Sequence, residues 1–371
     1  MKVFYVVNKD NKTMDGCVYY RNYLPALYLT ASGNHDCKLS NQFRSKAKEN
    51  KETKSVDVFF DITFIMESDI IVLSRYYEIT DFPMIKSFID AAHHYGKKVV
   101  YETDDNLFDI PEHNQVRGEA IKARELILYM MRNCDAYTVT TERLGRFLNT
   151  ICEKPTYVLP NSVEFDSKAN VIYKGEIPEK KEGVIRIGWT GGGTHIKDLA
   201  AVSGALKRIV KNHNNVEFMS LCSTALDQSV FDFKHNHIDL VPVEIYHEVL
   251  NDMNLDIAVC PLIGDKFNSG KSAIKWTEYS MCAVPTIYSA VAPYSDIIED
   301  GITGLGVYKN TKNSWIEALE KLIFDEDLRG NLRANAYNKV YNDFNMEYNF
   351  LLWEKAYTEV LKNEPNNTNT A

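Results

Sequence analysis

Short apolar runs alternate with amphipathic stretches along the whole chain, and this alternation indicates the fold. In the first half, apolar runs of strand length occupy residues 2–7, 56–60, 70–73, 98–102, 136–140 and 156–159. Helical patterns occupy 14–33, 82–95, 115–133 and 142–150, whereas 36–55 is polar and is expected to form a loop around a short element. Strands that alternate with helices predict a parallel sheet, whose ligands bind at the carboxyl ends of the strands.

A second alternation follows the polar, helix-poor stretch 164–183, which ends in KGEIPEKKEG. Strands are expected at 184–189, 216–221, 237–241, 255–262, 286–288 and 305–307, and helices at 197–212, 246–253, 312–325, 327–340 and 348–361. We therefore predict an α/β protein with two doubly wound, Rossmann-like domains that face a deep cleft. The expected divisions are 1–163, a linker at 164–183, 184–340, and 341–371 with a helix that packs back on the first domain and a disordered tail, NEPNNTNTA.

The stretch 255–285 combines a strand, a loop and a helix within about thirty residues. The apolar run 255–262 is broken at Gly264, and apolar positions return at helical spacing from about Lys271. Asn268 or Ser269 is expected to cap this helix, which should stop before Pro285.

Lys271, Lys275 and Glu278 stand at i, i+4 and i+7 and should project from one side of that helix. The helix dipole disfavours a cation in the first turn by about 0.3–1 kcal/mol, so Lys271 is best explained by an anion between it and the backbone amides. A phosphate group is the natural anion. The alternative is a solvated face with a lysine–glutamate pair of little energetic value.

The segment GDKFNSGKS superficially matches the P-loop of nucleotide-hydrolysing enzymes. Five residues separate Gly264 from Gly270, one more than the P-loop allows, and Asp265 stands where the first glycine is required. A carboxylate there would repel phosphates, so we do not interpret this segment as a P-loop.

Composition narrows the class of protein. The 371 residues are 45% hydrophobic and 25% charged, which is typical of soluble globular proteins and is enough for two domains. The net charge of −9 gives no overall attraction to nucleic acid or to an anionic membrane, although contact with a membrane surface is left open. Seven scattered cysteines without CxxC spacing argue against disulfides or zinc and favour the cytoplasm. No apolar run is long enough to span a membrane, and Met1 leads straight into a strand.

Asp104 and Asp105 follow a predicted strand, at the end where this fold places catalytic groups. Repulsion between adjacent carboxylates should raise one pKa and suit that group to accept a proton from an acceptor hydroxyl. The alternative is that one of the pair caps the following turn. We consider a metal-binding DxD motif a weaker interpretation.

Several segments, in order, resemble a family-4-type retaining glycosyltransferase of the GT-B fold (glycosyl transferases group 1). They are VVYETDDNLFDIP, DAYTVTTERL and VLPNSVE in the first half, then IGWTGGGTHIKDL and FNSGKSAIKWTEYSMCAVPTIYSAVAPYSDIIEDGITGLGV in the second. The resemblance covers most of the chain, and several matches in the same order are more specific than any one motif.

The resemblance implies that a nucleoside-diphosphate sugar binds the C-terminal domain. Glu278 would bind the ribose, and glycine-loop amides with lysine side chains would hold the diphosphate. The predicted donor-binding residues are Gly192, Gly193, Thr194, His195, Lys197, Gly270, Lys271, Ser272, Lys275 and Glu278. Two positions depart from the family pattern, because Gly270 stands where a first glutamate is usual and Gly192 replaces a common arginine. TGGGTH could also be a plain strand-to-helix turn, and His195 merely the residue that starts the helix.

Gly16, Tyr20 and Arg21 lie in the first loop and helix and are candidate acceptor contacts, although a surface salt bridge would explain Arg21 equally well. The HNH run at 235–237 is interpreted as a loop and strand entry rather than as a metal site.

The resemblance therefore implies a hexosyl- or pentosyltransferase that moves a sugar to an acceptor hydroxyl with retention, the acceptor proton being drawn toward the departing phosphate. The cysteine content favours a cytoplasmic location. The resemblance implies no metal and no cofactor besides the nucleotide sugar, which is a co-substrate. It favours a surface glycan or lipid-linked saccharide as acceptor. Two alternatives remain, a hydroxymethylated base of viral DNA as the acceptor and a non-catalytic nucleotide-sugar-binding scaffold.

Overall fold

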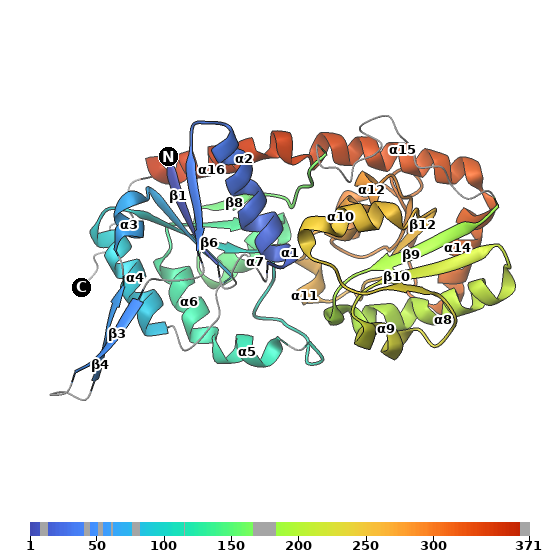
Figure 1. The fold of residues 1–371 in the computed structure, drawn as a ribbon, viewed down its shortest axis with the longest axis horizontal. Helices are drawn as coiled ribbons and strands as arrows, with labels where there is room; N and C mark the ends of the chain where they lie inside the picture. The colour runs from blue at the N-terminus through green and yellow to red at the C-terminus, as the bar shows by residue number, and fades with distance from the viewer. Residues whose placement is uncertain are drawn as a thin grey trace. The chain divides into compact units, whose positions relative to one another are not determined.

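The computed structural model describes residues 1–7, 14–40, 45–50, 55–60, 62–75, 82–114, 116–165 and 183–363. Nearly all of the expected linker at 164–183 and of the tail lies outside these residues. The chain divides into two compact units, which are Met1–Asn161 with Tyr348–Ala371, and Ser162–Glu347. We call them the N-terminal and the C-terminal unit, and Figure 1 shows the elements of each.

A six-stranded, wholly parallel sheet forms the core of the N-terminal unit, in the order β2-β1-β5-β6-β7-β8. Its strands are β1 (Lys2–Val6), β2 (Asp36–Ser40), β5 (Ile70–Ser74), β6 (Lys98–Thr103), β7 (Ala136–Val139) and β8 (Thr156–Val158). All five side chains of β5 are buried, as expected of an apolar central strand covered on both faces.

The polar stretch after the first helix is more ordered than the sequence predicts. β2 is an edge strand, and β3 (Ser45–Asn50) pairs antiparallel with β4 (Ser55–Phe60) in a separate two-stranded ribbon (Figure 1). The expectation of a loop around one short element at 36–55 is therefore wrong, because two strands lie in this stretch. Polar edge strands do not produce the apolar pattern on which strand prediction relies.

The helices of the N-terminal unit flank its sheet. They are α1 (Gly16–Val18), the π-helical η1 (Tyr19–Tyr23), α2 (Leu24–Ala31), α3 (Thr63–Glu67), α4 (Phe82–His94), α5 (Arg117–Lys122), α6 (Arg124–Asn133) and α7 (Glu142–Ile151). The last helix, α16 (Met346–Lys362), also packs here, since Trp353 lies under the Arg21 guanidinium at 5.5 Å and the Tyr357 ring lies 6.4 Å from that of Tyr5.

The C-terminal unit repeats the same architecture with the strand order β11-β10-β9-β12-β13-β14, again wholly parallel. The strands are β9 (Ile185–Thr190), β10 (Val216–Leu221), β11 (Asn236–Ile238), β12 (Ile257–Cys260), β13 (Thr286–Ser289) and β14 (Leu305–Val307). The helices are the 3-10 turn η3 (Gly193–His195), α8 (Ile196–Asn212), α9 (Thr224–Val230), α10 (Val243–Asp252), α11 (Lys266–Ser269), α12 (Ile274–Met281), α13 (Tyr294–Ile297), α14 (Lys312–Phe324) and α15 (Glu326–Asp343). The prediction of two doubly wound α/β domains is confirmed.

Each sheet has one place where the chain reverses its direction of winding. In the N-terminal unit this switch point lies between β1 and β5, and in the C-terminal unit between β9 and β12. The connections after the two strands of each pair run to opposite faces of the sheet. A crevice therefore forms at the carboxyl ends of these strands, and doubly wound sheets bind their ligands in this crevice. These two places are where functional residues are expected.

Candidate functional site

The glycine loop leaves the C-terminal end of β9, at the switch point of the C-terminal unit. Gly192, Gly193 and Thr194 are exposed, and a Cβ on either glycine would meet no atom within 4 Å. Gly191 is different, because a Cβ there would lie 2.6 Å from Lys275 Nζ. The loop therefore needs its first glycine for a close contact with the next element, while the other two glycines expose the backbone to a ligand.

His195 ends the 3-10 turn and is fixed by Asp198, a buried residue in the first turn of α8. His195 Nδ1 lies 2.8 Å from Asp198 Oδ2, and Asp198 Oδ1 accepts the backbone N–H of Ile263 at 2.8 Å. Burial and the nearby Lys275 lower the pKa of His195 to about 4, so the ring is neutral at physiological pH. Its Nδ1 must then donate to Asp198, which leaves Nε2 as a hydrogen-bond acceptor. Asp198 thus joins the glycine loop to the loop after β12.

The helix expected from Lys271 is arranged differently. A four-residue helix, α11, precedes it, and Asp265 caps α11 by accepting the Asn268 N–H at 2.7 Å. The long helix α12 starts only at Ile274, with no side-chain cap. The predicted capping by Asn268 or Ser269 is therefore wrong, because the Asp265 carboxylate starts a separate turn upstream.

The two lysines of this segment are held in different ways. Lys271 precedes α12, and its Nζ lies 4.5 Å from the centre of the Phe267 ring. Lys275 is on α12, where its Nζ donates to the carbonyl of Thr190 at 2.9 Å and lies 5.5 Å from the Trp189 ring centre. Gly270, just before Lys271, is buried, and Ser272, just after it, is half-buried. Lys197 is exposed on the first turn of α8.

Glu278 is buried, with 6% of its surface exposed, and a tyrosine from another helix orients it. The hydroxyl of Tyr246, on α10, donates to Glu278 Oε2 at 3.1 Å and lies 2.6 Å from Thr190 Oγ1. Tyr279 adds a contact on the same threonine, because its hydroxyl accepts the Thr190 N–H at 2.8 Å. Thr190, the last residue of β9, is thus bonded to the side chains of Lys275, Tyr246 and Tyr279.

Electrostatics make this edge of the C-terminal sheet receptive to an anion. Burial lowers the pKa of Lys275, and the Glu278 carboxylate opposes that shift. A desolvated ammonium gains more from a phosphate than an exposed one does, because the local dielectric is low. The arrangement can therefore hold a phosphate at the lysines while the carboxylate takes hydroxyl donors.

Asp104 and Asp105 follow β6 in the N-terminal unit, and an arginine lies against both of them. Arg75 Nη1 donates to Asp104 Oδ1 at 3.1 Å and to Asp105 Oδ2 at 2.7 Å. Burial alone would raise the pKa of Asp104, but the Arg75 guanidinium, the Cys17 thiol and Arg21 together hold it below its usual value. Asp104 is therefore not the member of the pair whose pKa is raised. The turn that follows is capped by Asn106, whose Oδ1 accepts the Phe108 N–H at 3.1 Å.

Arg75 was missed by sequence reasoning. It comes directly after β5, at the switch point of the N-terminal unit, with a φ of 36° that side-chain-bearing residues rarely adopt. Its backbone N–H donates to the Glu102 carbonyl at 2.7 Å, which fixes this conformation. The signal that could have revealed Arg75 in the sequence is an arginine directly after an apolar run of strand length.

The predicted acceptor contacts divide between surface and core. Gly16 is exposed at the start of α1, which Asp15 caps, whereas Tyr20 is buried in the π-helical segment. Arg21 is 2% exposed and pairs with Glu102 through Nε at 2.7 Å and Nη2 at 3.0 Å.

The remaining partners of Arg21 are also in the protein interior. Its Nη1 donates to the Leu159 carbonyl and to Asn161 Oδ1, and Thr138 Oγ1 donates to Glu102 Oε2. The surface salt bridge considered from the sequence is therefore wrong, since this ion pair is buried. Arg21 also lines a small cavity of about 10 Å³, together with Asp15, Cys17, Val18, Ser74, Arg75, Glu102 and Asp104.

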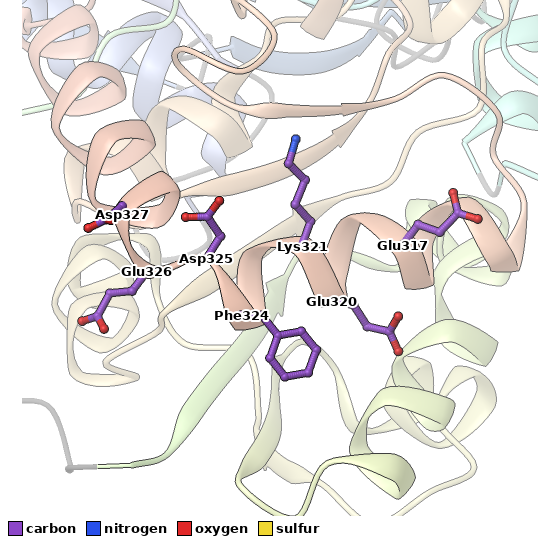
Figure 2. A pocket seen from close by; sticks show the side chains of 7 residues that line it. All are labelled: Glu317, Glu320, Lys321, Phe324, Asp325, Glu326 and Asp327. Atoms are coloured by element: carbon purple, nitrogen blue, oxygen red, sulfur yellow. The ribbon is translucent and has the colours of Figure 1, made fainter.

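A wider, open hollow of about 830 Å³ lies elsewhere on the C-terminal unit, along α14 and the start of α15 (Figure 2). It contains none of the predicted site residues. Its lining is Glu317, Glu320, Lys321, Phe324, Asp325, Glu326 and Asp327. Five carboxylates against one lysine repel a nucleoside diphosphate, so this hollow is not a donor site.

Comparison with known proteins supports the interpretation of the C-terminal unit. Residues 243–339, which include Tyr246, Lys271, Lys275 and Glu278, match the family model described as glycosyl transferases group 1. The resemblance to group 1 glycosyltransferases, inferred from the sequence motifs, is thereby confirmed over residues 243–339. Comparison with curated protein sequences found no match.

Solved structures share the fold of this chain over nearly its full length. Sucrose-phosphate synthase from Thermosynechococcus elongatus matches with a TM-score of 0.67 and 12% identity, over 97% of this chain and 98% of that one. A glycosyltransferase from Rickettsia africae matches with a TM-score of 0.64 and 14% identity, over 98% and 99%. Anabaena HepE in complex with UDP and glucose matches with a TM-score of 0.63 and 10% identity, over 97% and 100%. The predicted GT-B fold class is confirmed. Within the described ranges, no helix has the length and apolar character needed to cross a membrane.

Proposed function

We propose that this protein transfers a sugar from a nucleoside-diphosphate sugar to an acceptor hydroxyl, with retention of anomeric configuration. One observation carries the proposal. The segment that matches group 1 glycosyltransferases brings Lys271, Lys275 and a buried Glu278 to the switch point of a doubly wound sheet, beside an exposed glycine loop. Such a crevice is where this class of sheet binds nucleotides.

In the proposed complex, Glu278 accepts hydrogen bonds from the ribose, and Tyr246 holds its carboxylate in place. The diphosphate lies against the backbone of Gly192 and Gly193 and takes charge from Lys271 and Lys275, without a metal ion. We propose UDP as the first nucleotide to test, because solved structures of the same fold are complexes with UDP or UDP-glucose.

Acceptor binding is proposed for the N-terminal unit, at Asp104 and Asp105. Arg75 keeps Asp104 ionised, so it is better suited to accept and orient a hydroxyl hydrogen bond than to remove a proton. In the transfer step, the acceptor oxygen bonds to the anomeric carbon as the bond from that carbon to the phosphate oxygen breaks. The acceptor proton goes to the departing phosphate. We propose a surface glycan or a lipid-linked saccharide as acceptor, and the cytoplasm as the location.

The first experiment is thermal stability against UDP, other nucleoside diphosphates and their sugars. A ligand at 100 times its dissociation constant adds about 2.7 kcal/mol to the free energy of unfolding, which is a readily measured shift. We expect a shift with one nucleotide family. No shift with any nucleotide would refute the donor site.

Lys271→Ala tests the phosphate contact. Loss of a hydrogen bond to a charged group costs about 1.5–3 kcal/mol, so the dissociation constant for the nucleoside diphosphate should rise at least about tenfold. Lys266→Ala, an exposed lysine on the neighbouring helix α11, is the matched control and should leave affinity unchanged. Equal affinity of both variants would place the diphosphate elsewhere.

A further inference from the structure

His195 is the only titratable side chain in the glycine loop at 190–195. It ends the 3-10 turn η3, directly after the exposed Gly192, Gly193 and Thr194, and 16% of its side chain is exposed. The ring therefore lies next to the backbone against which the diphosphate is proposed to bind, and part of its surface is accessible to a ligand.

Asp198 holds this ring in one orientation and one tautomer. Its Oδ2 lies 2.8 Å from His195 Nδ1, and its Oδ1 accepts the N–H of Ile263 at 2.8 Å, so both oxygens of a buried carboxylate are engaged. A carboxylate can only accept, so Nδ1 carries the proton of the neutral ring. Nε2 is then the ring atom with which His195 can contact a ligand, and in the neutral ring it offers only a lone pair.

Two ammonium groups keep the ring neutral in the free protein. Lys275 Nζ and the His195 ring both pack on Trp189, with distances of 5.5 and 6.4 Å to the centre of its ring. Burial is the largest cause of the lowered pKa of His195, about 4. The charges of Lys275 and Lys271 add to this shift, and Asp198 opposes it. The described contacts of the two lysines are a carbonyl and an aromatic ring, which leave both positive charges uncompensated.

A neutral Nε2 is poorly matched to a phosphate. The oxygens of an ionised diphosphate accept hydrogen bonds, and so does the lone pair of Nε2, so a direct contact between them is repulsive. A proton on Nε2 removes this conflict and makes the contact a charge-assisted hydrogen bond. The diphosphate also favours that proton, because its negative charge offsets the two ammonium groups that disfavour the imidazolium.

We propose that His195 takes up one proton when the donor binds and then donates a hydrogen bond from Nε2 to a phosphate oxygen. This role rests on the proposed function, because it concerns the same diphosphate. The proton comes from solvent, and no covalent bond of the donor forms or breaks in this step. Asp198 is a positioning residue here, since it fixes Nδ1 and stabilises the charged ring.

Proton uptake makes donor affinity depend on pH. A complex that holds an additional proton becomes more stable as pH falls, until the ring of the free protein is itself protonated at about pH 4. If the bound diphosphate restores the pKa of His195 to its ordinary value of about 6.5, the dissociation constant should be about tenfold lower at pH 5.5 than at pH 7.5. A histidine with a purely structural role would produce no such change.

Isothermal titration calorimetry of the full-length chain with UDP-glucose tests this role. Both phosphates of UDP-glucose are esterified, so the ligand lacks the terminal phosphate ionisation near about pH 6 that would confuse the proton count. Titration in buffers of different ionisation enthalpy gives the number of protons taken up. We expect about 0.9 proton per complex at pH 5.5 and about 0.1 at pH 7.5, from pKa values of about 4 and 6.5 for the free and bound states.

Two variants identify the group that takes up the proton. His195→Asn should abolish the uptake and the pH dependence of affinity while UDP-glucose still binds, because the two lysines remain. His93→Asn is the matched control, since His93 is also a histidine beside a carboxylate, Asp135 at 3.3 Å, but lies in the N-terminal unit. This control should take up the same number of protons as the unmodified chain.

The outcomes separate this role from the donor site itself. Binding of UDP-glucose by the unmodified chain without proton uptake at pH 5.5 would overturn the role of His195 and leave the donor site standing. Uptake that persists in His195→Asn would overturn it as well, because another group would then carry the proton. No binding of UDP-glucose at either pH would refute UDP sugars as donors, and the role of His195 toward them with it.

Discussion

Replacement of Glu278 by glutamine tests the donor site most directly. The carboxylate is buried and accepts the Tyr246 hydroxyl at 3.1 Å. Glutamine has nearly the same shape and can keep an oxygen toward Tyr246, so Glu278→Gln removes the charge with little change in packing. An effect on binding therefore reports the charge itself, which an alanine variant would not.

The magnitude follows from the hydrogen bonds that change. A bond to a charged group contributes about 1.5–3 kcal/mol, against about 0.5–1.5 kcal/mol between neutral groups, so each ribose hydroxyl loses about 1 kcal/mol. Two hydroxyls then lose about 2 kcal/mol, which raises the dissociation constant for UDP about thirtyfold.

Isothermal titration calorimetry with UDP and with pyrophosphate separates the two halves of the donor. Glu278→Gln should weaken UDP binding and leave pyrophosphate binding unchanged, since the lysines remain. Glu317→Gln, at an exposed glutamate of α14, is the matched control and should bind both ligands normally. Unchanged affinity for UDP in Glu278→Gln, or an equal loss for pyrophosphate, would refute the assignment of Glu278 to the ribose.

Three further predictions follow from buried or crowded groups. Arg21→Met leaves Glu102 buried without its charged partner and should cost about 3–5 kcal/mol of stability, measured by denaturant unfolding; an unchanged midpoint would contradict the ion pair. Gly191→Ala places a Cβ 2.6 Å from Lys275 Nζ, so it should lower the free energy of unfolding by about 1–3 kcal/mol and weaken UDP binding. Normal UDP affinity in this variant would argue against a role of this contact in UDP binding. The folded pKa of His195, about 4, is below its unfolded value of about 6.5, so the unfolded chain binds the proton first. The free energy of unfolding should therefore fall by up to about 3 kcal/mol as pH drops from about 6.5 to 4, and His195→Asn should reduce this loss. The same pH profile in the variant and in the unmodified chain would contradict the contribution of His195.

The fold was predictable because buried parallel strands have a strong local signal. The run at 70–73 is apolar throughout, and only a central strand covered on both faces requires that. The polar edge strand β2 lacks such a signal, since its side chains are exposed or half-buried and its pairing depends on the backbone of β1. The start of α12 was missed for a related reason, because Asp265 caps a short helix that no periodicity reveals.

The site was predictable only where its residues lie in one continuous motif. Lys275 and Glu278 were found by their spacing, but the partners that orient them come from other segments. Tyr246 and Thr190 meet Glu278 and Lys275 only in the folded chain, through bonds that span up to 85 positions in sequence. The lowered pKa of Asp104 could not be predicted, because Arg75, 29 positions away, is brought against it only by the pairing of β5 with β6.

The charges at the two switch points favour different ligands, and this supports the proposed division of labour. Near β9 and β12, Lys271 and Lys275 lie toward an exposed glycine loop, and burial of Lys275 makes a phosphate a favourable partner. Near β1 and β5, the cavity includes three carboxylates and two arginines, and Glu102 takes up the charge of Arg21. A diphosphate would be repelled by that excess of carboxylates, whereas a neutral hydroxyl could donate a hydrogen bond to Asp104. These charges therefore support the proposal that the donor binds at the C-terminal sheet and the acceptor at the N-terminal one.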